Sequence, residues 1–425
     1  MLLRRSSLLL SAVSVIATAC GDSDSPMLST APKLNTTSAP EALGLFHRFV
    51  SIGTSVSMGF QSDGAVAAGQ QQSWTAQLAQ LAGRDQSLPL IEFPGCRSPF
   101  AAPLASGKRL SGEGAGAAPA SFGCAANEVG VTLPAQNVAV AGARTSDALN
   151  ATPESKAGDA DWGKLYTRIL PPNTTQLAAA LAQKPKFISV ELGANEVLGA
   201  VSGIAVPGAS LVPFSVWAPQ YTTLADAVAT EVDRGILVGL VDDVASFPSF
   251  RRGEEIWADR ATMLAAFNVN VNANCDGNTN LIFVPVRIPT AVGTGAFYRA
   301  NGLGAFNFSC ADGGQFARDY VLTPAESAVV NTQLASMNEH IIRTAAAHGY
   351  AYMALQSLYG RSDIKPAFSS LALMTSATPY GAAVSLDGLH PSQLGHGILA
   401  AAAARAINAR YGLNLAETPA EIALR

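Results

Sequence analysis

Charge and histidine are both scarce in this chain. Of its 425 residues 14% are charged, the formal net charge is −4, and only five residues are histidines. Without a cluster of Lys or Arg to neutralise phosphates, binding to nucleic acid has no support. Hydrophobic residues make up 48%, which excludes a largely disordered chain and is enough for a sizeable core. The length fits two or three domains of ordinary size, but we expect one enlarged α/β domain.

Long hydrophobic runs are absent after the N-terminus. Residues 1–19 contain Arg4 and Arg5, an apolar stretch and small residues, which predicts a secretory signal peptide because the stretch is too short to span a bilayer. Residues 20–44 are rich in Ser, Asp, Thr, Pro and Ala, which is typical of a flexible linker. We therefore expect the folded domain to cover residues 45–425.

The signal peptide ends in ATAC, which resembles the cleavage box of bacterial lipoproteins. In such proteins the cysteine becomes the lipidated first residue, which is Cys20 here, although the pattern usually has Leu where this chain has Ala17. The resemblance implies a lipid anchor. Because no Asp follows Cys20 directly, it also implies the outer membrane of a Gram-negative bacterium. Export to the periplasm or the medium without an anchor is the alternative.

Cysteine is scarce too, with five residues in the chain. If Cys20 carries lipid, four remain, an even number that permits three pairings in an oxidising compartment. The pairing of sequence neighbours would tie down two irregular insertions near 88–128 and 275–310. The rival interpretation is a metal site, but no C-x-x-C spacing or nearby histidine supports it. We predict no metal and the disulfides Cys96–Cys124 and Cys275–Cys310.

Short apolar runs alternate with helical patterns along the chain. Runs that are apolar on both faces are typical of buried parallel strands. Helical patterns lie between them, for example SWTAQLAQLAG, the segment that follows Thr323, and the alanine-rich segment after His390. This alternation predicts a doubly wound α/β sheet with its chemistry beyond the carboxyl ends of the strands. The five predicted strands begin at Phe49, Asn137, Phe187, Gly235 and Ala351.

Residues suited to nucleophilic catalysis follow these strand ends. Ser55 lies in GTSVS at a strand-to-helix turn, where a nucleophile would be exposed. A serine hydroxyl needs a neutral imidazole to attack an ester, and His390 in DGLHPS is the candidate, with Asp387 to orient it. The backbone N–H groups of Ser55 and Gly142 and the side-chain amide of Asn195 would stabilise an oxyanion.

These blocks, in this order, resemble those of the SGNH, or GDSL, hydrolase family. GTSVS supplies the serine, AVAGA the glycine, LGANE the asparagine, and DGLHPS the aspartate and histidine. The chain departs from the family at Thr54 and at Glu196, where Asp is usual in each case. The resemblance implies a flavodoxin-like three-layer fold with about five parallel strands. It also implies hydrolysis of carboxylic esters through an acyl-enzyme, without cofactor or metal.

Simpler interpretations of these residues stay open. Ser55 would serve equally as a helix N-cap, with Ser57 as the nucleophile. Gly142 would serve a turn, and Asn195 and Asp387 would brace loops.

Three further features suggest structural roles. His396 lies within the last predicted helix and is expected to pack there. Asp242 and Asp243 follow the fourth strand, but no histidine or third carboxylate lies close in sequence, so we expect no metal there. The apolar stretch 205–221 either packs on the body of the domain or forms an acyl-binding wall.

The sequence predicts an exported serine esterase or lipase whose partners are a membrane and an ester substrate, either an acyl lipid or an acetylated glycan. Two alternatives are a glycan O-deacetylase of the same fold and a catalytically impaired surface lipoprotein that binds a ligand. A nucleotide-binding module is not expected, because no G-x-G-x-x-G follows the first strand.

Overall fold

Four short parallel strands form the central sheet, in the order β1-β2-β3-β9. Every residue of the first three strands is buried, because helices cover both faces, and this explains why their sequences do not alternate. The strands are β1 (Phe49–Gly53), β2 (Phe187–Glu191), β3 (Gly235–Gly239) and β9 (Ala351–Ala354).

A fifth segment runs parallel to the free edge of β1. The N–H groups of Val138 and Val140 donate to the carbonyls of Ser51 (2.9 Å) and Gly53 (3.1 Å). Counted in chain order, the five segments lie in the order 2-1-3-4-5, which is the flavodoxin-like arrangement. The predicted α/β fold class is confirmed, although only four of the five segments are regular strands.

This structure is a computed structural model, and it describes residues 40–116, 122–160 and 162–417. The described residues all belong to one compact unit, Thr36–Arg425. The predicted signal peptide, Cys20 and the linker up to residue 39 lie outside the described residues. None of the helices in the described ranges is both long enough and apolar enough to cross a membrane.

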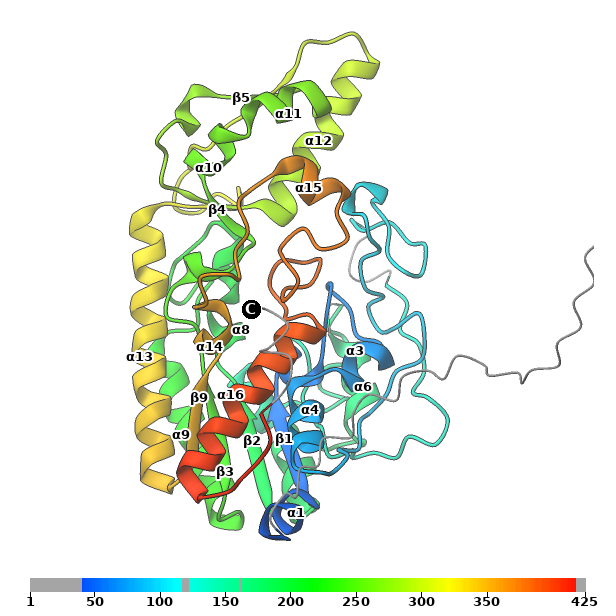
Figure 1. The fold of residues 1–425 in the computed structure, drawn as a ribbon, viewed down its shortest axis with the longest axis vertical. Coiled ribbons are helices and arrows are strands. Elements are labelled where there is room, and N and C mark those ends of the chain that lie inside the picture. The colour runs from blue at the N-terminus through cyan, green and yellow to red at the C-terminus, as the bar shows by residue number, and fades with distance from the viewer. Residues whose placement is uncertain (1–39, 117–121, 161, 418–425) are drawn as a thin grey trace, which may run out of the picture. The chain divides into compact units, whose positions relative to one another are not determined.

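Two layers of helices enclose the sheet (Figure 1). On one face α4 (Trp74–Leu81) and α16 (Gln393–Tyr411) pack together, and α16 also contacts β9. The other layer contacts β1 and β3 and consists of α5 (Thr145–Asn150), α7 (Gln176–Ala182), α9 (Phe214–Glu231) and α13 (Pro324–His348). The shorter helices are α2 (Ser55–Met58), α3 (Ala67–Gln71), α6 (Gly163–Ile169), α8 (Ala194–Val197), η3 (Leu198–Ser202), α14 (Gln356–Tyr359) and α15 (Ser370–Thr375).

Side-chain caps start two of the long helices, α13 and α16. The hydroxyl of Thr323 accepts from the N–H of Glu326 at 3.2 Å, and the Glu326 carboxylate accepts from the N–H of Thr323 at 2.9 Å, which is a capping box. Ser392 caps α16 by accepting from Gly395. Eleven residues of α16 are buried, and its many alanines allow this close packing on all sides.

The folded domain begins earlier than the predicted boundary at residue 45. Helix α1 spans Pro40–Phe46, and Ala42 and Phe46 are buried. The ring of Phe46 stacks on that of Phe187 in β2, with centroids 4.8 Å apart. Residues 40–44 are therefore part of the domain, and their assignment to the linker is wrong because the apolar positions of α1 bury against the sheet.

The segment 275–310, expected as an irregular insertion, contains regular elements and is part of a larger substructure. Residues 244–322, at the top of Figure 1, hold an antiparallel sheet β4-β6-β8 and a parallel pair β5-β7. Strands of two or three residues show no period that a sequence scan detects. The elements are η4 (Val244–Ser246), β4 (Phe250–Arg252), α10 (Gly253–Ala258), α11 (Arg260–Phe267), β5 (Val269–Val271), η5 (Ala273–Cys275), β6 (Leu281–Phe283), α12 (Val284–Ala300), β7 (Phe306–Phe308) and β8 (Val321–Leu322).

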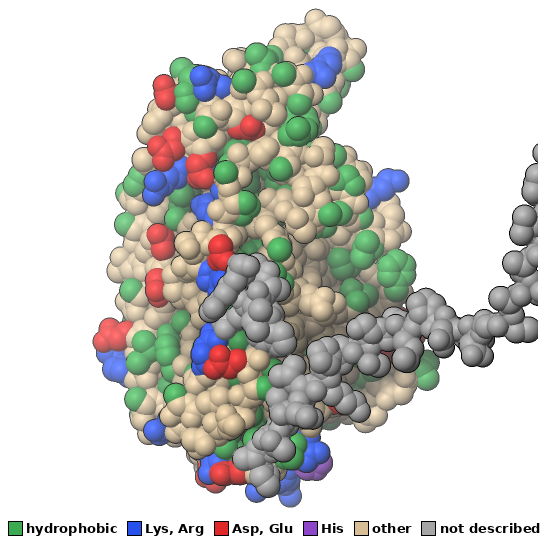
Figure 2. Space-filling model, viewed as in Figure 1, with side chains coloured by type: hydrophobic (Ala, Val, Ile, Leu, Met, Phe, Trp, Pro, Cys, Tyr) green, Lys and Arg blue, Asp and Glu red, His purple; other side chains and the backbone are tan. Residues whose placement is uncertain are grey.

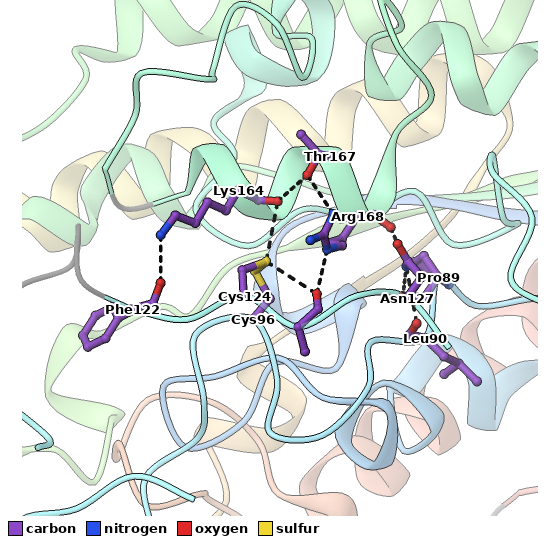
Figure 3. Close-up of a disulfide and its surroundings, with 10 residues drawn as sticks. Pro89, Leu90, Cys96, Phe122, Cys124, Asn127, Lys164, Thr167 and Arg168 are labelled. Atoms are coloured by element: carbon purple, nitrogen blue, oxygen red, sulfur yellow. Dashed lines mark hydrogen bonds between the residues drawn. A yellow bond between two sulfur atoms is a disulfide. The ribbon is translucent and has the colours of Figure 1, made fainter. Parts of the chain in front are cut away.

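Both expected disulfides are present. Cys275–Cys310 lies within this substructure, and Cys96–Cys124 lies in the first insertion, whose described residues include a single short helix, η1 (Leu104–Ser106). The Cys96–Cys124 insertion docks on α6, where Arg168 Nε donates to the Ala125 carbonyl at 2.6 Å (Figure 3). Covalent closure and this docking replace the apolar core that the first insertion lacks.

Acidic and basic side chains are interspersed on the face shown in Figure 2. They do not form a large patch of one sign there.

Candidate active site

Ser55 is the first residue of α2, directly beyond the end of β1. The turn is tight: a Cβ on Gly53 would lie 2.6 Å from the side chain of Ser57. Ser57 is fully buried and its hydroxyl accepts from the indole N–H of Trp74 at 3.2 Å, so the alternative nucleophile has no access to substrate. The N-cap position belongs to Thr54, so the interpretation of Ser55 as an N-cap is wrong.

The structure brings Ser55, His390 and Asp387 together from opposite ends of the domain. His390 Nε2 lies 2.9 Å from Ser55 Oγ, and His390 Nδ1 lies 2.8 Å from Asp387 Oδ2. In the tautomer that satisfies both contacts, Nδ1–H donates to the carboxylate and Nε2 accepts from the hydroxyl. The side chain of His390 is 17% exposed, which leaves the imidazole edge accessible to a substrate.

The loop between Asp387 and His390 is held by its own carboxylate. Asp387 accepts from the N–H groups of Leu389 (2.9 Å) and His390 (2.8 Å). It also accepts from the N–H of Asp63 at 2.7 Å. Gly388 has φ +73°, a conformation that side chains rarely adopt, and an added Cβ would lie 2.9 Å from the ring of Tyr380. The spacing D-G-L-H is therefore a turn that delivers carboxylate and imidazole together.

Burial and charge act in opposite directions on this pair. Burial by itself raises the pKa of Asp387, but the interaction with His390 and the N–H donors outweigh it and lower that pKa below its usual value. Burial disfavours the charged imidazolium, yet the charge and hydrogen bond of Asp387 raise the pKa of His390 above its usual value. Asp387 therefore stays ionised while His390 is a stronger base than a free histidine.

Asp63 and two arginines of the first insertion form a charged cluster that supports the aspartate loop. Asp63, whose N–H binds Asp387, pairs with Arg97 (2.7 Å) and with Arg109 (2.6 Å), whose side chain is 2% exposed. The Arg109 guanidinium lies 4.5 Å from the ring centroid of Phe122. Sequence reasoning missed this cluster, because its members lie in segments without periodicity.

Glu191, which the sequence analysis did not single out, places a carboxylate beside Thr54, where the resembled family has an aspartate. Glu191, at the end of β2, is buried, and its carboxylate oxygens accept from the Thr54 hydroxyl at 2.8 and 2.9 Å. It also accepts from the N–H groups of Thr54 (3.0 Å) and Ser57 (3.1 Å). Burial raises the pKa of Glu191, and these donors partly offset the rise. A carboxylate thus lies at this turn, but it comes from the neighbouring strand β2. The one acidic residue in the apolar run FISVE was the sequence feature that could have indicated it.

Gly142 lies in the loop before α5, and Asn195 lies in the short helix α8. Gly142 has φ +78°, and an added Cβ would lie 2.5 Å from the indole of Trp162, so a side chain is excluded there. Asn195 Nδ2 donates to the Ala143 carbonyl at 2.8 Å, which holds the asparagine against the Gly142 loop. Within the described residues, the N–H groups of Ser55 and Gly142 donate to no protein acceptor.

Glu196, the second departure from the resembled pattern, joins α8 to the start of α5. It is buried and its carboxylate accepts from the N–H of Thr145 at 2.7 Å. Burial raises its pKa, and the contacts with Thr145 partly offset the rise. Glu196 therefore fixes the spacing between α8, which carries Asn195, and the segment that follows Gly142.

The remaining candidates have structural roles. His396 is fully buried, its Nδ1 accepts from the N–H of Trp74 at 3.3 Å, and burial lowers its pKa to about 3. Asp243 caps η4. In the stretch 205–221, Trp217 is buried and donates to the Thr145 hydroxyl at 2.9 Å, so this stretch packs on the body of the domain. No three His, Cys, Asp or Glu side chains in the described ranges are grouped so that they could hold a metal ion.

Comparison with known proteins finds no matching family model and no matching curated protein. Among solved structures, the chain is similar to Axe2, an acetylxylan esterase from Geobacillus stearothermophilus, with 12% identity and a TM-score of 0.34 over 84% of this chain and 93% of that chain. It is also similar to an extracellular lipase from Streptomyces rimosus, with 12% identity and a TM-score of 0.35 over 85% and 98%. The assignment of the fold rests on the strand order described above.

Proposed function

We propose that this protein is a serine hydrolase of the SGNH type that cleaves carboxylic esters through an acyl-enzyme. The observation that carries the proposal is the contact of 2.9 Å between Ser55 Oγ and His390 Nε2, with Asp387 on the other ring nitrogen. A hydroxyl that contacts a base, which in turn contacts an orienting carboxylate, is the arrangement that nucleophilic catalysis requires.

In the first half-reaction Ser55 Oγ attacks the ester carbonyl carbon while His390 Nε2 takes the hydroxyl proton. The imidazolium then returns this proton to the alkoxide oxygen as the C–O bond breaks and the alcohol leaves. Water attacks the acyl-enzyme in the same way and releases the acid and free Ser55. Asp387 keeps the proton on Nδ1 and stabilises the imidazolium at both stages.

The negative charge that develops on the carbonyl oxygen needs donors already in place. The N–H groups of Ser55 and Gly142 and the second N–H of the Asn195 amide are the donors we assign to it. Asn195 keeps one N–H on Ala143, and its amide carries two, so the side chain is held while one donor remains for substrate.

The proposal extends to the place of action. Two disulfides suit an oxidising compartment, and the sequence pattern at Cys20 suits a lipid anchor, so we propose an exported protein held at the outer membrane. The substrate would then be an acyl lipid or an acetylated glycan outside the cytoplasm.

The test is the release of p-nitrophenol from acetate and butyrate esters by the purified protein. Ser55→Ala and His390→Ala should each lower kcat by about 10⁴–10⁶-fold. The half-buried Ser336 and the exposed His47 provide matched controls as Ser336→Ala and His47→Ala, which should retain full turnover. If the unmodified protein shows no turnover and no covalent labelling by a fluorophosphonate, a ligand-binding lipoprotein becomes the better account.

A further inference from the structure

A cavity of about 70 Å³ has in its wall the sequence neighbours of two residues of the proposed active site, and every residue that lines it is apolar. Leu389, one residue before His390, forms part of its wall. Ala194, one residue before Asn195, forms another part. The cavity therefore begins within one residue of the general base on one side and of an oxyanion donor on the other.

The wall at Leu389 is rigid. The N–H of Leu389 donates to Asp387 Oδ1 at 2.9 Å, and its carbonyl accepts from the hydroxyl of Tyr359. The ring of Tyr359 in turn packs on Phe247, another lining residue, with centroids 4.6 Å apart. The turn that positions His390 thus also fixes this side of the cavity.

The substructure 244–322 and helix α13 supply further parts of the wall. Val244 lies in η4 and Phe250 in β4, whereas Val330 and Leu334 lie on the buried face of α13. The size of the cavity is therefore set partly by the substructure 244–322 and not only by the elements of the central sheet.

Resting on the function proposed above, we infer that this cavity receives the hydrocarbon chain of the acyl group. An apolar cavity without polar groups stays dry and favours an apolar occupant. A sugar would need hydrogen-bond partners that these side chains do not provide. An acetyl group ends one carbon beyond the ester carbonyl and would leave the cavity unfilled. The substrate class is therefore esters of fatty acids longer than acetate, not acetylated glycans.

The size of the preference follows from burial. Each methylene moved from water into an apolar site contributes about 0.8 kcal/mol, which corresponds to about a fourfold rise in kcat/KM. Butyrate has two more methylenes than acetate, so kcat/KM should rise by about 15-fold between the two p-nitrophenyl esters, after correction for their rates of hydroxide hydrolysis. The rise should stop once the cavity is full.

The test compares neighbouring valines on α13. Val330 lines the cavity and is 1% exposed, whereas Val329 is 39% exposed on the outside of the helix. Val330→Phe fills the cavity and should reduce the butyrate-to-acetate ratio of kcat/KM to about 1–2. Val329→Phe adds the same ring outside and should keep the ratio of the unmodified protein. Val330→Ala enlarges the cavity and should move the preferred ester to a longer chain.

The outcomes separate this inference from the function on which it rests. If Ser55-dependent turnover and fluorophosphonate labelling are present but the unmodified protein prefers acetate, the cavity is not an acyl site. A ratio in Val330→Phe equal to that in Val329→Phe, with both variants melting as cooperatively as the unmodified protein, would also overturn it. If Val330→Phe does not fold, an unchanged chain-length preference in Val330→Ala would overturn the inference instead. No turnover and no labelling of the unmodified protein refutes the hydrolase itself.

Discussion

Placing an aspartate at position 54, where the resembled family has one, should destabilise this protein in a way that depends on pH. Thr54 and Glu191 are each 1% exposed, and their side-chain oxygens are 2.8 and 2.9 Å apart. Thr54→Asp would set two carboxyl groups at about this distance in a buried site, where both cannot be ionised. One of them must take up a proton for the protein to fold.

The cost follows from the protonation. An ordinary carboxyl group has a pKa of about 4, so keeping one protonated at pH 7 costs about 3 pKa units, or about 4 kcal/mol at 1.36 kcal/mol per unit. At pH 5 the same group costs about 1.4 kcal/mol, because one unit remains. The loss in free energy of unfolding caused by Thr54→Asp should therefore become smaller as the pH falls from 7 to 5.

The assay is urea unfolding of the purified variants at pH 7 and pH 5. Thr54→Asn has the shape of the aspartate without its charge. Its loss of stability should be smaller than that of Thr54→Asp at pH 7 and about the same at both pH values. In the double variant Thr54→Asp with Glu191→Gln, the new carboxylate can accept from the amide, so most of the loss at pH 7 should be recovered. If Thr54→Asp unfolds at the same urea concentration as Thr54→Asn at pH 7, or if the double variant recovers nothing, the role assigned to Glu191 is wrong.

Two other predictions concern activity. Because the proposed mechanism needs neutral His390 and the charge of Asp387 raises the pKa of His390, the acid limb of kcat/KM should lie above the usual histidine value of about 6.5. Asp387→Asn should move this limb to lower pH and cut kcat by about 10³–10⁴-fold; a limb that does not move in a pH titration contradicts the assignment. Gly142→Ala brings a Cβ to 2.5 Å from Trp162 at φ +78°, so kcat should fall at least tenfold. Gly142→Ala combined with Trp162→Ala relieves the clash and tests whether the loss comes from this contact.

Much of the fold could be predicted because local signals coincide with the structure. Apolar runs correctly located the strands that begin at Phe49 and Phe187, and the helical segment predicted after Thr323 is α13. The spacing from Asp387 to His390 is short enough to close one turn, so this pair could be predicted without knowledge of the rest of the chain.

Contacts between distant segments were decided only by the tertiary structure. The sequence does not indicate that Glu191 binds Thr54, or that Asp63 binds Asp387, because each contact joins residues more than a hundred positions apart. The substructure 244–322 escaped prediction because its strands are too short to show a period.

The sequence by itself determined which chemical groups are present, the alternation of strands and helices, and the local turn at residues 387–390. Such features depend on residue type and on neighbours within a few positions. Only the tertiary structure decided that Ser55 and not Ser57 faces the imidazole, and that Leu389, next to His390, lines an apolar cavity. These two features depend on how segments that are far apart in the sequence pack together. A periodic pattern predicts that a face is buried, but it does not indicate which segment covers that face.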